Sequence, residues 1–421
     1  MGRLGCGLIL SLLCGAVPAL AADITISCGA VGQERELCEG AAKAWAQARG
    51  HSVSLHTPPD NSDERYFQYL VDLGDGKDEV DVYQIDVIWP GLLAHHLVDL
   101  KQYLSEEDVG RHFPAIIASN TVEDRLVGMP WFTDVGMLYY RKDLLEAYEA
   151  EVPVDWSELA DVALHIQESE RAAGREGLWG YVFQGGAYEG LTCNAVEWLT
   201  AYGADPLLDA DGQVAINNVL ATLVLSRAAG WVGTIAPPRV TAFNEEDARN
   251  TFQVGNAVFM RNWPYAWALL NEPDSPVAGK VGIAPLPKGG PFGRPTATLG
   301  GWQLAVSKYS RNPEVAADLV RYLSSEAVQK ARAIEGSYAP TIVSLYDDAE
   351  VLAATPFFAE LKPILENAVA RPSDVSGPLY MAVTTRFWEA VHNTLIGRRS
   401  ASDNLAALAD QVRLIRSRSA N

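Results

Sequence analysis

The chain has 421 residues and a formal net charge of −20, from 33 basic and 53 acidic side chains. A negative excess of this size argues against nucleic acid or an anionic membrane as a partner. The few His and Cys residues show no zinc-site spacing, and no phosphate-binding glycine loop or Gly-x-Ser-x-Gly turn is present, so we expect no metal, cofactor or nucleophilic serine.

The N-terminal segment has the pattern of an export signal. A basic start at Arg3 is followed by a short apolar run over 4–13 and by the small-residue sequence Ala19-Leu20-Ala21. The apolar run is too short to span a membrane. A buried N-terminal helix is the alternative, but the glycines and the proline in this segment weaken it. We therefore expect a signal peptide over 1–22 and a periplasmic location.

Three cysteines follow this segment. Cys28 and Cys38 enclose a short loop, and an oxidising compartment permits a disulfide that would join the end of the first strand to the first helix. Two reduced, buried thiols are the alternative. Cys193 is expected to be a small buried hydrophobic residue.

The mature chain begins with a repeated strand–helix–strand pattern. Alternating apolar residues predict strands at 24–26 and 53–55, and a helical stripe over 37–48 separates them. A second helix is expected at 65–73, before an apolar run at 80–88 that suits a buried parallel strand. This order predicts an open α/β sheet with right-handed crossovers.

Further along the chain, helical segments predominate. Asn312-Pro313-Glu314 has the pattern of a helix start, with a cap, a proline and an acid. Other helices are expected from Asp155, which can cap its helix, at 197–202, at 219–231 and from Met381 onward. Extended structure is expected at 126–140 and 252–260.

A mature chain of roughly 400 residues exceeds a single core, so two domains are expected. Because no flexible linker is present, the chain should cross directly between them, and such crossings make a hinge. Candidate crossings combine Gly or Pro with aromatic residues at 132–136, 299–303 and 336–341. The expected lobes are 23–132 plus 303–340, and 136–300 plus 341–421.

Aromatic residues gather with acids or amides in four segments, at 81–89, 130–134, 261–267 and 300–303. This mixture suits a sugar, whose C–H faces pack on rings and whose hydroxyls bond to carboxylates. Asp86 would lie at the carboxyl end of a strand, where open sheets bind ligands. Alternatively, Asp86 is a helix cap.

Four tryptophans are expected in the core, because they lie on helical stripes: Trp45, Trp156, Trp179 and Trp198.

At these segments the sequence resembles the maltose/trehalose-type periplasmic binding proteins of ATP-driven sugar importers, within the extracellular solute-binding superfamily. The most specific elements are Asn-Trp-Pro-Tyr-Ala-Trp and Leu-Gly-Gly-Trp. The matching stretches run in family order over nearly the whole mature chain, at 84–89, 132–145, 183–191, 261–267, 281–287, 299–302 and 366–372.

The resemblance implies the two-lobed α/β fold of periplasmic binding proteins, with three hinge crossings and a cleft that binds a ligand without catalysis. We expect a monomer that delivers a disaccharide to the permease subunits of an ABC importer. Two aspartates would accept sugar hydroxyls, aromatic rings would form the walls, a glycine would donate its amide, and an arginine would donate its guanidinium. The ligand-binding residues implied are Glu34, Arg65, Asp86, Phe132, Asp134, Trp263, Tyr265, Gly301, Trp302, Tyr338 and Arg371.

Departures from the family pattern leave the sugar open. Phe132 stands where trehalose binders carry Tyr, and Tyr338 stands near a position where they carry Trp. Trehalose, sucrose and maltose all remain candidates. Two other functions also remain. One is an exported glycoside hydrolase that uses Asp86 and Asp134, and the other is a receptor for a polyamine, amino acid or oligosaccharide.

Overall fold

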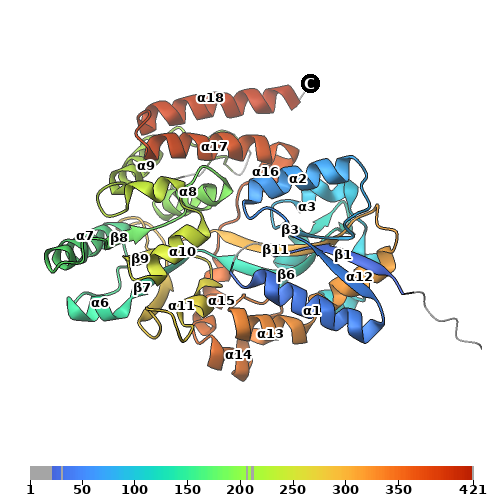
Figure 1. Cartoon of the computed structure of the whole chain (residues 1–421). Coiled ribbons are helices and arrows are strands. Elements are labelled where there is room, and N and C mark those ends of the chain that lie inside the picture. Colours follow the sequence, from blue (N-terminus) through green and yellow to red (C-terminus); the bar gives the residue numbers. More distant parts are fainter. Residues whose placement is uncertain (1–20, 30–31, 205–206, 210–212, 420–421) are drawn as a thin grey trace, which may run out of the picture.

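The computed structural model describes residues 21–29, 32–204, 207–209 and 213–419. Apart from Ala21 and Ala22, the expected signal peptide lies outside these residues. The chain forms two lobes, each built on its own sheet and covered by helices (Figure 1). The expected two-lobed α/β architecture is therefore confirmed.

Lobe 1 is built on a five-stranded mixed sheet. Strand β1 pairs in parallel with β2 and β3, while β11 runs antiparallel to β3 and β6. The sheet order is β2 (Ser52–His56), β1 (Asp23–Ser27), β3 (Val82–Asp86), β11 (Leu299–Val306) and β6 (Met129–Val135). The main helices are α1 (Glu34–Arg49), α2 (Ser62–Gly74), α12 (Pro313–Leu323) and α13 (Glu326–Gly336). Shorter elements are α3 (Pro90–Leu93), α4 (Glu106–Gly110), α5 (Pro114–Ser119), β4 (Thr121–Val122) and β5 (Arg125–Leu126).

Lobe 2 is built on a four-stranded sheet in which only β8 and β9 are parallel. Its order is β10 (Val281–Pro285), β7 (Met137–Arg141), β9 (Ala257–Asn262) and β8 (Trp179–Val182). The helices before β10 are α6 (Lys142–Ala147), α7 (Trp156–Ala172), α8 (Glu189–Ala201), α9 (Val219–Trp231), α10 (Glu245–Gln253) and α11 (Ala266–Leu270). The later helices are α14 (Ala349–Ala354), α15 (Phe358–Glu366), α16 (Ser373–Ser376), α17 (Tyr380–Leu395) and α18 (Ala401–Ser419).

Most local signals in the sequence act as expected. Helix α1 ends at Gly50, which adopts a left-handed conformation and donates its amide to Ala46. Asp155 caps α7 through a 2.7 Å bond from the amide of Ser157. Two expectations are wrong. Asn312 makes no side-chain cap bond at the start of α12, and residues 252–253 end helix α10 instead of beginning a strand.

Most of the tryptophans expected in the core, and all three cysteines, are found as the sequence predicts. Trp45 is buried in lobe 1, while Trp156 and Trp198 are buried in lobe 2, as expected. Trp179 differs, because it is only half-buried and the guanidinium of Arg171 lies over its ring. A disulfide joins Cys28 to Cys38, and Cys193 is a buried free thiol.

Three segments that link the lobes lie side by side. The chain passes from β6 into β7 through Gly136, and Leu299 at the start of β11 pairs with Val135. After α13, the amide of Thr133 donates to the carbonyl of Ala339 over 2.9 Å. These are the segments from which the sequence predicts hinge crossings.

Gly301 in β11 has a backbone conformation that other residues cannot adopt without strain. Its φ is +127°, and a Cβ there would lie 2.7 Å from the carbonyl oxygen of Phe132. We predict that Gly301→Ala lowers the free energy of unfolding by about 1–3 kcal/mol, measured by urea denaturation.

The matched control is Gly230→Ala in helix α9, where a Cβ meets no atom within 4 Å. This change should stabilise the protein by about 0.5–1 kcal/mol, because alanine loses less backbone entropy in a helix. Equal effects of the two substitutions would contradict the conformational argument.

Candidate functional site

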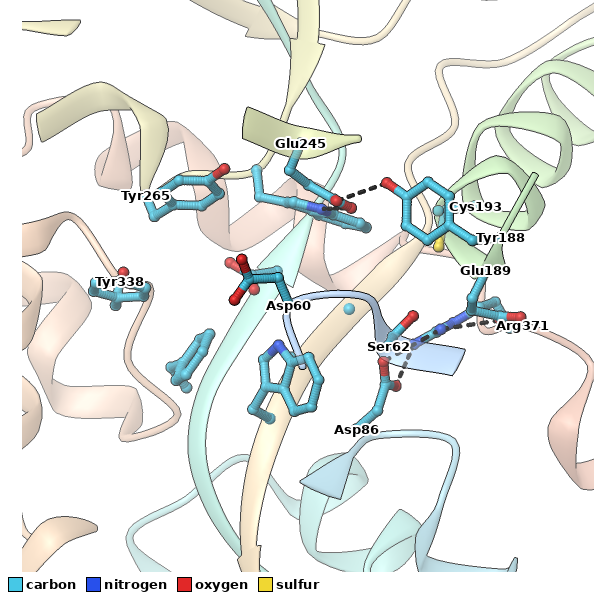
Figure 2. A pocket seen from close by; sticks show the side chains of 17 residues that line it. Asp60, Ser62, Asp86, Tyr188, Glu189, Cys193, Glu245, Tyr265, Tyr338 and Arg371 are labelled. Carbon is cyan, nitrogen blue, oxygen red and sulfur yellow. Dashed lines mark hydrogen bonds and ion pairs between the residues drawn. The ribbon is translucent and has the colours of Figure 1, made fainter. Parts of the chain in front are cut away.

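A pocket lies between the two lobes and encloses about 670 Å³, open solvent at its mouth included (Figure 2). The residues that line it are Asp60, Ser62, Asp86, Phe132, Asp134, Tyr188, Glu189, Gly190, Cys193, Glu245, Trp263, Tyr265, Gly300, Gly301, Trp302, Tyr338 and Arg371.

The fold brings together most of the binding residues that the sequence predicts. Those in the pocket wall are Asp86, Phe132, Asp134, Trp263, Tyr265, Gly301, Trp302, Tyr338 and Arg371. Their convergence follows from the sheet of lobe 1, in which Trp302 of β11 pairs with both Asp86 and Phe132, and Gly300 pairs with Asp134. Residues distant in the sequence thus occupy adjacent positions on three strands.

Glu34 and Arg65 do not lie in the pocket wall. Both side chains are fully buried behind it. The carboxylate of Glu34 accepts a 2.5 Å hydrogen bond from Gln84. The guanidinium of Arg65 lies 4.6 Å from the ring centre of Trp302, and its Nε donates to the carbonyl of Pro59. Arg65 therefore supports the ring of Trp302 from outside the pocket.

Asp134 is an acid of the pocket wall with a buried oxygen that forms no hydrogen bond among the described residues. Within the described part of the chain, its Oδ1 is buried and has no hydrogen-bond partner. Burial raises the pKa of Asp134 well above its ordinary value, and the negative charge of Glu34 adds to this effect. The guanidinium groups of Arg261 and Arg332 oppose the rise in this pKa.

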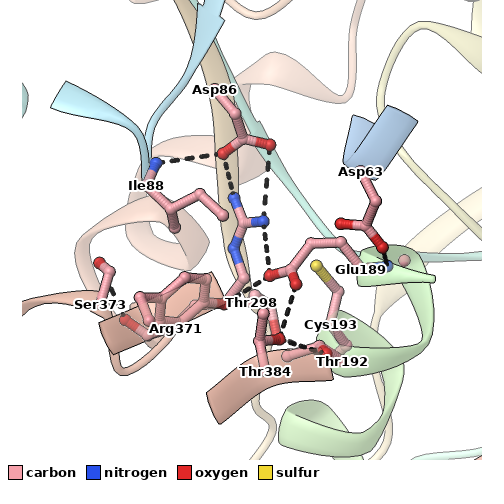
Figure 3. A network of polar contacts seen from close by, with 12 residues as sticks. Asp63, Asp86, Ile88, Glu189, Thr192, Cys193, Thr298, Arg371, Ser373 and Thr384 are labelled. Carbon is pink, nitrogen blue, oxygen red and sulfur yellow. Dashed lines mark hydrogen bonds and ion pairs between the residues drawn. The ribbon is translucent and has the colours of Figure 1, made fainter. Parts of the chain in front are cut away.

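Arg371 joins acids from both lobes (Figure 3). Its Nη2 donates to Asp86 at the end of β3 over 2.5 Å, and its Nη1 donates to Glu189 at the start of α8 over 3.1 Å. Glu189 also accepts hydrogen bonds from the hydroxyls of Tyr380 and Thr384 in α17. Burial raises the pKa of Glu189, whereas the charge of Arg371 lowers it.

Asp63 forms a second contact between the lobes (Figure 3). Its Oδ2 accepts from the amide of Glu189 over 3.2 Å, and Tyr188, which precedes α8, provides no side-chain cap of its own. Asp63 of α2 therefore caps a helix of the other lobe. Burial raises the pKa of Asp63 to about 7, and the negative charge of Glu189 contributes to this rise.

Two acids at the start of α10 hold the aromatic rings of lobe 2. Glu245 accepts from the hydroxyl of Tyr188 over 2.6 Å and from the indole of Trp263 over 3.4 Å. Glu246 accepts from the hydroxyl of Tyr265 over 2.7 Å. These bonds fix the positions of the rings before a ligand binds.

Sequence reasoning missed the pocket residues Asp60, Tyr188, Glu189 and Glu245. Tyr188 and Glu189 lie in one of the stretches that resemble sugar-binding proteins, so the resemblance offered a signal for both. In the sequence, Glu245 shows only the pattern of an acid in the first turn of a helix. Cys193 also lines the pocket, and burial raises the pKa of its thiol to about 12.

Two α/β lobes around a pocket of acids and aromatic rings define a two-lobed binding protein. The model of the bacterial extracellular solute-binding protein family matches residues 34–330. The chain belongs to this family.

Known relatives agree with this assignment. A protein of Deinococcus radiodurans described as "Probable ABC transporter-binding protein" is 48% identical over 401 residues, which cover 95% of each chain. The maltose-bound structure of MalE3 from T. maritima is 38% identical, with a TM-score of 0.89 over 94% of this chain and 100% of that one. The GacH receptor of Streptomyces glaucescens, solved unliganded and with acarbose, is 24% identical, with a TM-score of 0.81 over 94% and 99%. At that identity, GacH supports the fold alone.

Two features are absent from the described residues. None of the helices in this part of the chain has the length and apolar character needed to span a bilayer. Nor do three or more His, Cys, Asp or Glu residues within it gather where they could hold a metal ion.

We predict that Asp63 makes the stability of the protein depend on pH. Its ordinary pKa of 3.8 is raised to about 7 in the folded chain, so the folded state binds this proton more tightly than the unfolded state. The stabilisation is complete below about pH 4 and is lost as the pH rises to about 7. Asp63→Asn should remove this component, so that the variant gains melting temperature relative to the wild type across that interval.

Asp60→Asn is the control, because it replaces the carboxyl group of a nearby acid that lines the pocket and leaves Asp63 in place. Melting curves at half-unit pH steps would measure the effect. Parallel profiles for the wild type and Asp63→Asn would count against a raised pKa at Asp63.

Proposed function

We propose that this chain is a periplasmic receptor that binds a disaccharide of the trehalose, sucrose or maltose class and delivers it to an ABC importer without catalysis. The observation that carries the proposal is the pocket wall itself. Carboxylates and flat aromatic rings from positions 60 to 338 line one cavity between the lobes.

The pocket chemistry supports a sugar ligand. The C–H faces of pyranose rings can pack on Trp263, Tyr265 and Trp302, while Asp134 can accept ligand hydroxyls at an oxygen that no described group satisfies. A ligand hydrogen bond contributes about 0.5–1.5 kcal/mol where the acceptor is neutral and about 1.5–3 kcal/mol where it is charged. A few such bonds with ring packing are enough for selective binding of an uncharged polyol.

The relatives support the same class of ligand and partner. A maltose-bound structure at 38% identity makes a disaccharide a reasonable ligand for this chain, since the two chains overlap almost completely. The Deinococcus radiodurans relative is described as a transporter-binding protein, which supports membrane permease subunits as partners. Delivery of this kind needs only a monomer.

Closure of the lobes would couple binding to delivery. We place lobe 1 at 23–132 plus 303–340 and lobe 2 at 136–300 plus 341–421, with hinge crossings at 132–136, 299–303 and 336–341. The contacts of Arg371 and Asp63 join the lobes beside the pocket, so they would form on closure. A ligand that touches both lobes stabilises the closed arrangement by its differential affinity.

The raised pKa of Asp134 also suits a second function, a glycoside hydrolase with a protonated acid. Against this, Asp86, the expected ionised partner, is held by Arg371. Long incubation of the protein with trehalose, sucrose and maltose would separate the two functions. Intact sugar is the expected result, and released monosaccharide would favour the hydrolase.

We predict that at least one of trehalose, sucrose and maltose binds to the mature protein and raises its melting temperature. Trp302→Ala should weaken this binding by tenfold or more, because it removes a ring from the wall. Trp179→Ala is the matched control, since this half-buried tryptophan lies outside the pocket and should leave the affinity unchanged. Isothermal titration calorimetry would measure both.

The calorimetry panel should include spermidine and an oligosaccharide. Binding of spermidine without any binding of the three disaccharides would overturn the proposal in favour of a polyamine receptor, and binding of the oligosaccharide alone would favour a receptor for longer sugars.

A further inference from the structure

Glu197 and Arg261 form an ion pair in the interior of lobe 2, and neither side chain has any exposed surface. The Nε of Arg261, near the end of β9, donates to Oε2 of Glu197 in α8 over 2.9 Å, and its Nη2 donates to Oε1 over 2.5 Å. The remaining Nη1 donates to the side-chain oxygen of Gln184 over 3.2 Å. Each guanidinium nitrogen therefore has an acceptor, and this forked pairing holds Arg261 in one orientation.

The guanidinium of this pair lies over the ring of Trp263. Its central carbon is 3.8 Å from the centre of the ring, which lines the pocket. On another side the ring packs closely on strand β11, because a Cβ at Gly300 would lie 3.1 Å from Cζ3 of Trp263. A cation over a ring face attracts it. Since Arg261 cannot move without breaking its bonds to Glu197, it restrains the position of this ring.

The same ion pair contacts two segments that link the lobes. The Oε1 atom of Glu197 accepts from the amide of Thr298, directly before β11, over 3.1 Å. At Gly136, between β6 and β7, a Cβ would overlap with this oxygen and would lie 2.8 Å from Nη2 of Arg261. Glycine at this position therefore leaves the room that the ion pair occupies. One buried pair thus joins a ring of the pocket to both connections.

We propose that Arg261 and Glu197 are positioning residues of the pocket, which hold the ring of Trp263 in place against the two connections before a ligand binds. Their role in affinity rests on the proposed sugar-binding function, whereas the position of the ring requires no ligand. Replacing a buried ion pair as a unit often leaves stability unchanged. Positioning can therefore be tested separately from folding.

Two variants disturb the pair in different ways. The double substitution Arg261→Met with Glu197→Gln removes both charges together, so that neither is left buried without a partner. Gly136→Ala keeps both charges but displaces them. The matched control is Arg141→Met with Asp143→Asn, which removes another ion pair of lobe 2 that lies outside the pocket. Thermal melting would establish that each variant is folded.

The indole N–H signal of Trp263 reports the position of the ring in the ligand-free protein. It can be recorded in ¹H–¹⁵N NMR spectra and assigned with Trp263→Phe. Both disturbing variants should move this signal by more than its line width, because the guanidinium leaves or shifts from the ring face. The signal of Trp302, whose ring contacts Arg65 instead, should stay in place. The control variant should leave both signals unchanged.

Affinity provides the second readout, measured by calorimetry with trehalose, sucrose and maltose. For each sugar that binds the wild type, the double substitution at Arg261 and Glu197 should weaken binding by about two- to tenfold, because a ring that is not fixed beforehand loses conformational freedom on binding. The control variant should bind as tightly as the wild type.

The outcomes separate the two proposals. An unmoved Trp263 signal in either folded variant would overturn the positioning role, and so would equal movement of the Trp263 and Trp302 signals, which indicates a general disturbance. Unchanged affinity in the double variant, with a wild type that binds, would overturn the role in binding. If the double variant does not fold, Gly136→Ala decides. Failure of the wild type to bind any of the three sugars would instead reject the proposed function, and the indole signal would still decide whether the pair positions Trp263.

Discussion

The guanidinium of Arg371 holds two buried carboxylates that belong to different lobes, and the geometry of the pocket depends on this contact. Asp86 ends a strand of lobe 1, and Glu189 begins a helix of lobe 2. Removing one member of a buried charged group leaves the others uncompensated, at a cost of about 3–5 kcal/mol. The guanidinium therefore bridges the opposed walls of the pocket, and the position of Glu189 is fixed further by the hydroxyls of α17.

Three other buried arginines follow a common arrangement around the pocket. Arg65 lies over the ring of Trp302, Arg261 over Trp263, and Arg332 over Phe132 and Tyr338. Each of these rings lines the pocket and also contacts a guanidinium. A ring held in this way loses little conformational freedom when a ligand packs on it, which favours binding.

The sequence predicted those parts of the fold and site that depend on local patterns or on the resemblance. The glycine that ends α1 and the aspartate that caps α7 act through their own neighbours, so composition and spacing were sufficient. Composition pointed to the segments that hold Asp134 and Trp302, the resemblance implied their roles, and the pairing of β6 with β11 explains why they meet. The contact of Asp63 with α8 joins residues 126 positions apart, and no local pattern carries it. Glu34 and Arg65 were expected in the pocket but do not line it, and the contacts of Glu34 with Gln84 and of Arg65 with Trp302 follow from no local pattern.

The strands that connect the lobes also carry much of the pocket. Strand β6 holds Phe132 and Asp134 and continues through Gly136 into the sheet of lobe 2, while β11 enters lobe 1 beside it with Gly301 and Trp302. Because these residues are paired across a hydrogen-bonded ladder, a ligand cannot contact Asp134 and Trp302 without contacting the connection itself. A change in the angle between the lobes would therefore move the pocket wall directly, and no separate relay between binding site and connection is needed. The strand pairing that requires glycine at position 301 therefore also sets the orientation of the neighbouring aromatic wall.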